Sequence, residues 1–63
     1  MSDLKVIKIA TVKELTTLST ASIYRLIKKG TFPKQIKLAE RSSGWFLEEI
    51  YNWLKDKGNA RND

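Results

Sequence analysis

The sequence predicts a mainly α-helical domain with one small β-hairpin, in the order helix, helix, strand, strand, helix. Three observations lead to this fold class: two short helical segments close together, a following stretch of alternating polar and apolar residues, and an amphipathic segment near the end. A chain of 63 residues has room for one domain at most. We expect that domain to cover residues 1–58 and to be followed by a frayed polar tail at residues 59–63.

The first part of the chain predicts a short extended lead-in and then a short helix. Residues 5–9 alternate loosely between polar and apolar side chains, which favours the extended lead-in. Thr11 followed three positions later by Glu14 is typical of a capping box, in which each side chain binds a backbone amide at a helix start. The first helix is therefore expected from about Val12 to Thr16 or Thr17.

The second helix carries its own start and stop signals. Ser19 is the expected N-cap, because its hydroxyl can accept a hydrogen bond from the amide of Ala21 or Ser22. Gly30 is expected to end the helix in the left-handed conformation. At about 100° per residue the segment has one apolar and one polar face. The apolar face holds Ile23, Leu26 and Ile27, and Ala21, Tyr24, Arg25 and Lys28 lie opposite.

The second half of the chain predicts a hairpin and a closing helix. Residues 35–38 alternate as a half-buried strand does, with Ile36 and Leu38 on one side, and residues 44–46 are the expected partner strand. Residues 39–43 would connect the two strands, and we interpret this hairpin as a wing. The closing helix is expected over Leu47–Lys57, with Gly58 as its C-cap. Its apolar stripe holds Leu47, Ile50, Trp53 and Leu54.

Positive charge is concentrated in the half of the chain that contains the second helix. The net charge is +5, and Leu4–Arg41 holds nine lysines and arginines against two acids. This asymmetry points to a polyanionic partner. The alternative is a solvated surface that keeps a small protein soluble.

The segment Val12–Lys29 matches a helix-turn-helix, in which the second helix can enter the major groove of double-stranded DNA. Arg25 can reach a phosphate or a guanine there, and Ala21 can touch a thymine methyl group. Arg41 at the hairpin tip can meet a minor groove or a flanking phosphate. The expected DNA-binding residues are Thr20, Ala21, Tyr24, Arg25, Lys28, Arg41, Lys37 and Lys34.

Other kinds of site find little support in these residues. The chain has no cysteine and no histidine, and it lacks a glycine-rich phosphate loop, so we expect no catalytic residue, no metal, no cofactor and no small-molecule substrate. Aromatic rings can stack on single-stranded bases, but the positions of Trp45 and Trp53 favour core packing. No apolar run reaches the length of a signal peptide or a membrane span, so a cytoplasmic location away from membranes is expected.

The same residues resemble the AlpA family of short phage and prophage regulators, which is related to excisionases and to the winged helix-turn-helix of the MerR type. The resemblance covers about residues 7–54, roughly three quarters of the chain. It rests on Leu18-Ser19, Ile23-Tyr24-Arg25, Gly30, Phe32-Pro33, Lys37-Leu38, Arg41, Trp45, Glu49-Ile50 and Trp53. It implies a cytoplasmic, non-enzymatic DNA-binding protein with a winged helix-turn-helix fold.

The chain departs from the family pattern at several positions. Thr17 stands where the family often has glycine, and Thr20-Ala21-Ser22 replaces a common Arg-Ser-Thr at the start of the reading helix. Gln35 replaces a frequent second proline, and Ala39-Glu40 replaces a frequent glycine-containing turn. The missing arginine at position 20 leaves the target sequence open, and Glu40 is expected to weaken DNA binding by the wing.

The sequence therefore predicts a sequence-specific protein that binds double-stranded DNA, and the resemblance implies a regulator that acts on phage transcription or on prophage excision. An integrase, or further copies of the chain along DNA, are candidate partners. An alternative function is a small prophage-encoded inhibitor whose basic face covers an acidic surface of a response regulator or an integrase. Activation, repression and excision control stay open alternatives, because all of them need the same docking on DNA.

Overall fold

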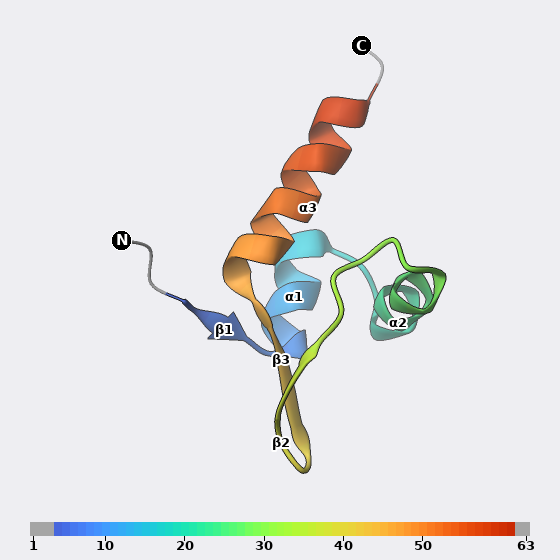
Figure 1. The fold of residues 1–63 in the computed structure, drawn as a ribbon. Coiled ribbons are helices and arrows are strands. Elements are labelled where there is room, and N and C mark those ends of the chain that lie inside the picture. The colour runs from blue at the N-terminus through green and yellow to red at the C-terminus, as the bar shows by residue number, and fades with distance from the viewer. Residues whose placement is uncertain (1–3, 62–63) are drawn as a thin grey trace.

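A computed structural model describes residues 4–61 and contains three helices and three strands among them (Figure 1). In chain order these are β1 (Val6–Ile7), α1 (Ile9–Thr16), α2 (Thr20–Lys29), β2 (Ile36–Ala39), β3 (Ser42–Phe46) and α3 (Leu47–Ala60). The predicted order of helix, helix, strand, strand and helix is confirmed, and the extended lead-in forms an additional strand. The fold is a winged helix-turn-helix.

The three strands form one antiparallel sheet in the order β1-β3-β2. Val6 pairs with Phe46 and Ile7 pairs with Trp45, and the Leu47 N–H donates to the Lys5 carbonyl over 2.8 Å. A single residue separates β1 from α1, and β3 continues directly into α3. The strand pairing therefore fixes where both helices begin.

The first helix begins earlier than the capping-box pattern predicted. It starts at Ile9 with Lys8 as N-cap, and no side chain caps it. Thr11 and Glu14 lie inside the helix, so the predicted capping box is wrong. The physical reason is the pairing of β1, which holds the chain until just before Lys8. The helix then begins at once, with the amides of Thr11 and Val12 both donating to the Lys8 carbonyl over 3.1 Å.

The predicted ends of the second helix are confirmed. The Ser22 N–H donates to Ser19 Oγ over 3.1 Å, which satisfies one of the free amides at the start of α2. Gly30 follows the helix with φ of 82°, and its N–H donates to the Ile27 carbonyl over 3.0 Å. A left-handed residue at this position is what allows the chain to turn away from the helix axis.

The hairpin turn is tighter than expected. Only Glu40 and Arg41 lie between the strands, and Ala39 pairs with Ser42 across the turn. The predicted five-residue connection over 39–43 is therefore wrong at both ends. The sequence has no Asn-Gly or Asp-Gly pair here, so it contained no signal for a two-residue turn.

A bulge in β2 changes which side chains face the core. Lys37 pairs with Ser43, but the next paired residue is Ala39, so Leu38 is the extra residue. A bulge interrupts the alternation of side chains along a strand. Ile36 is half-buried as predicted, whereas Leu38 is 47% exposed, contrary to the expectation that the two share a half-buried face.

The core takes residues from β1, all three helices, β3 and the segment after α2. Its buried members are Ile7, Val12, Ile23, Phe32, Trp45 and Ile50. Trp45, with 1% exposure, is the largest fully buried side chain, and Trp53 packs against the cluster half-buried. The prediction that both tryptophans pack in the core is confirmed.

The third helix runs past its predicted end. Gly58 lies inside α3, which continues to Ala60, so the predicted glycine C-cap is wrong. Gly58 does not adopt the positive φ that a helix-ending glycine needs, and the helix continues through it to Ala60. Fraying over residues 59–63 stays a prediction, and positions 62 and 63 lie outside the described residues.

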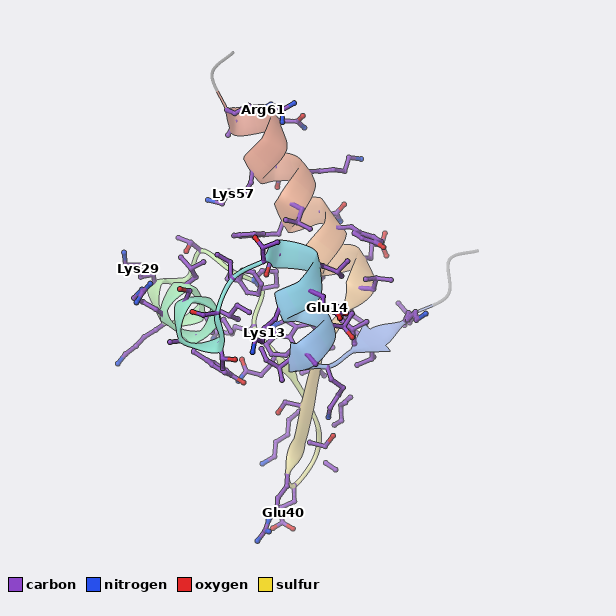
Figure 2. All side chains as sticks on the ribbon, turned by 180° about the vertical axis from the view of Figure 1, so that it is seen from behind. Lys13, Glu14, Lys29, Glu40, Lys57 and Arg61 are labelled. Atoms are coloured by element: carbon purple, nitrogen blue, oxygen red, sulfur yellow. The ribbon has the colours of Figure 1, made fainter. Side chains whose placement is uncertain are left out.

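Helix α3 and the hairpin project from opposite ends of the molecule. In Figure 2, Lys57 and Arg61 lie on the projecting part of α3, and Glu40 lies at the far end of the hairpin. The hairpin tip is thus well separated from the end of α3.

Thr17, the residue after α1, has φ of 61° in the left-handed region. This conformation costs an ordinary residue about 1–2 kcal/mol, and a β-branched side chain rarely adopts it. We expect Thr17→Gly to stabilise the protein by about 0.5–1 kcal/mol, which raises the melting temperature by about 3–8 °C. Thermal unfolding measures this shift. Thr17→Ala is the control, because alanine keeps the Cβ that causes the strain; an equal gain in both variants would contradict the explanation.

Candidate nucleic-acid interface

Five of the predicted DNA-binding residues share the outer face of α2. At about 100° per residue they fall within an arc of roughly 140°, and all five are exposed. They are Thr20, Ala21, Tyr24, Arg25 and Lys28. The opposite face holds Ile23, which is fully buried and anchors the helix on the core. An α-helix with its side chains is about 10–12 Å across, so α2 can fit a major groove about 12 Å wide.

Tyr24 links this outer face to the sheet. The centroid of its ring lies 6.5 Å from that of Trp45 on β3, with the ring planes tilted by 52°. Tyr24 is 42% exposed, whereas Trp45 is buried. One side of the candidate surface therefore borders the strand that forms the hairpin.

Two indole hydrogen bonds hold the exit segment, which we define as residues 31–33 between α2 and the hairpin. Trp45 Nε1 donates to the Pro33 carbonyl over 3.0 Å, and Trp53 Nε1 donates to the Thr31 carbonyl over 2.7 Å. Between these two carbonyls, the ring of Phe32 is buried edge-on against Trp53, with centroids 4.7 Å apart. The exit segment is thus fixed by bonds from both β3 and α3.

The other three predicted residues are spread along the exit and the hairpin rather than gathered beside α2. Lys34 follows the exit segment, Lys37 lies on β2 and Arg41 lies in the turn, and all three are exposed. Glu40 is the neighbour of Arg41, and Figure 2 shows it at the tip. The hairpin therefore presents one positive and one negative charge at its end.

The structure adds two polar contacts that sequence reasoning did not identify. Lys8 Nζ donates to Ser42 Oγ over 2.6 Å, which ties the start of α1 to the hairpin. Arg25 Nη2 donates to Ser22 Oγ over 3.2 Å within α2. The spacing of three between Ser22 and Arg25 was the available signal for the second contact, since residues three apart are neighbours on a helix. No comparable signal exists for two residues as far apart as Lys8 and Ser42.

An acidic hollow of about 460 Å³ lies between the exit segment and α3. Glu49 and Asp56 line it, together with Trp53, and both carboxylates are exposed. Like charges repel, so these two carboxylates disfavour contact with a phosphate backbone. The acids of α3 therefore provide controls for charge changes away from α2 and the hairpin.

Neither a metal-binding group nor a membrane-spanning helix is present among residues 4–61. Within that range no group of three or more acidic, histidine or cysteine side chains is arranged to hold a metal ion. No helix in the same range is long and apolar enough to cross a membrane.

Comparison with known proteins identifies the family. The family model described as "Prophage CP4-57 regulatory protein (AlpA)" matches residues 5–58. The chain belongs to the AlpA family. This is a family of phage regulatory proteins rather than of enzymes, and the resemblance inferred from the sequence motifs is confirmed.

A phage relative of this AlpA-family chain supports the assignment. The chain is 35% identical over 48 residues to a protein of Enterobacteria phage P4 with the name "Uncharacterized protein ORF88". The match covers 76% of this chain and 54% of the phage protein, so the chain spans about half the length of that relative.

Proposed function

We propose that this AlpA-family protein is a sequence-specific regulator that binds double-stranded DNA through the outer face of α2, with residues 1–58 as its single DNA-binding domain. The observation that carries the proposal is the polar face of a helix whose opposite face is buried at Ile23 and whose edge is held against β3 by Tyr24 and Trp45. A rigid helix with an exposed basic face is what entry into a major groove requires. The protein acts on DNA in the cytoplasm, controlling phage transcription directly or through excision.

Four residues of this face have roles that follow from their chemistry. Arg25 offers a planar fork that can bind guanine O6 and N7 or a phosphate, and Lys28 offers a point charge for a phosphate. Thr20 and Ala21 lie in the first turn of α2, where base-edge contacts are usual. Ala21 suits the methyl group of a thymine.

The hairpin adds contacts beside the major groove. Arg41 reaches a minor groove or a flanking phosphate, while Lys37 and Lys34 approach the backbone. Phosphate contacts fix the position of the protein and carry no sequence information. One short helix and one hairpin read few base pairs, so further copies of the chain or an integrase on adjacent DNA would extend the recognised site.

Salt dependence tests the electrostatic part of this function. If the protein neutralises about four to six phosphates, log K falls with log salt at a slope of roughly −4 to −5. We expect the double variant Arg25→Ala, Lys28→Ala to bind a selected duplex roughly 10- to 100-fold more weakly, with a slope shallower by about 1–2. Titration of a labelled duplex at several salt concentrations measures both quantities.

The matched control removes two positive charges elsewhere, in Lys5→Ala, Lys55→Ala, and should change affinity much less. Thermal unfolding of both variants shows whether the fold is kept. An affinity that does not change with salt concentration would contradict the major-groove model. An unchanged affinity in the variant Arg25→Ala, Lys28→Ala would contradict it too. Binding to an acidic protein surface without binding to DNA would favour an inhibitor instead.

The charge at the hairpin tip gives a prediction of stronger binding. Removing the negative charge in Glu40→Gln should tighten DNA binding by about two- to fivefold at low salt, because the carboxylate repels nearby phosphates. The gain should shrink as salt rises. Glu49→Gln makes the same change in net charge on α3 and should leave affinity unchanged. Equal gains in both variants would show that net charge, and not the position of the hairpin, is responsible.

A further inference from the structure

Arg25 is held by a short chain of hydroxyl groups along α2. Ser19 Oγ donates to Ser22 Oγ over 3.1 Å, and Arg25 Nη2 donates to the same Ser22 oxygen over 3.2 Å. A hydroxyl oxygen accepts two hydrogen bonds, so both acceptor positions of Ser22 are filled. Ser22 is half-buried beside the exposed guanidinium of Arg25.

We propose that Ser22 is a positioning residue, which holds the guanidinium of Arg25 in place for DNA without needing to contact DNA itself. This inference rests on the proposed function, because it assigns a purpose to Arg25 in DNA binding. A long arginine side chain loses rotamer freedom when it binds, and that loss weakens binding. An arginine side chain that is already held by one hydrogen bond loses less rotamer freedom when it binds DNA.

The bond to Ser22 leaves most N–H donors of Arg25 available for DNA. A guanidinium has five N–H donors in a planar fork, and the bond to Ser22 uses one of them. Fixing Nη2 restricts how that plane can turn about the side chain, while the remaining donors stay available to a base or a phosphate. Ser22 thus affects the direction of the fork rather than its charge.

The cap of α2 is separable from this role. The bond that caps the helix runs from the backbone N–H of Ser22 to Ser19 Oγ, and it survives when the Ser22 side chain is shortened to alanine. Alanine is also the strongest helix former. The Ser22→Ala variant therefore removes the hydroxyl from Arg25 and keeps the helix start.

The test is a double-mutant cycle with Ser22→Ala and Arg25→Ala, measured on a duplex selected from a random-sequence pool and on a scrambled duplex. We expect Ser22→Ala to weaken binding to the selected duplex by about three- to tenfold. The same change in an Arg25→Ala background should have no further effect, since Ser22 acts through Arg25. The salt slope of the single variant Ser22→Ala should match that of the wild type, because this substitution removes no charge.

Two further variants separate positioning from a general structural effect. Ser22→Thr keeps the hydroxyl and should restore most of the affinity. Thr31→Ala removes an exposed hydroxyl that donates to the Leu26 carbonyl at the other end of α2, and it should leave DNA binding unchanged. Thermal unfolding of every variant confirms that the fold is kept.

The outcomes distinguish the inference from the proposed function. If Arg25→Ala leaves affinity unchanged, the role of Arg25 in DNA binding fails, and the positioning role fails with it. If Arg25→Ala weakens binding and Ser22→Ala does not, only the positioning role is overturned. If Ser22→Ala weakens binding equally in both backgrounds, Ser22 contacts DNA directly and the positioning role is again overturned.

Discussion

The hydrogen bonds from two indole N–H groups to the exit segment are the constraint on which the candidate interface depends. Trp45 binds the Pro33 carbonyl and Trp53 binds the Thr31 carbonyl, so α2 and the hairpin are joined by a segment that β3 and α3 hold from two directions. A typical hydrogen bond within a protein contributes about 0.5–1.5 kcal/mol net, so the two bonds together favour this position of the segment over others. In a chain of 63 residues with a small core, a few such bonds decide the relative placement of the elements.

The sheet extends this constraint to the remaining elements. β1 leads into α1 after one residue and β3 leads into α3 without a break, so strand pairing sets the start of both helices. Trp45 lies on β3 at the centre of this arrangement, paired with Ile7 and in ring contact with Tyr24. The polar face of α2 is thus held in place by the packing of Ile23 in the core and, at its edge, by the ring contact between Tyr24 and Trp45.

Local signals in the sequence predicted the parts of this fold that depend on local chemistry. Ser19 and Gly30 mark the ends of α2 correctly, because a cap and a left-handed residue act within one turn of the helix. The capping box at Thr11 failed because strand pairing, a long-range contact, started the helix sooner. The exposure of Leu38 depends on a bulge in strand pairing, and Gly58 continues α3 in place of ending it. Neither is visible in a local pattern.

The most direct test is a titration of the ¹⁵N-labelled protein with a selected DNA duplex, followed by NMR. If a clamped exit segment presents α2 and the hairpin together, the amides of residues 20–28 and of residues 40–41 should shift in parallel at one saturating ratio. The indole protons of Trp45 and Trp53 should stay protected from exchange throughout. Shifts confined to α2, shifts centred on the acidic face of α3, or indole protons that exchange freely would contradict the account.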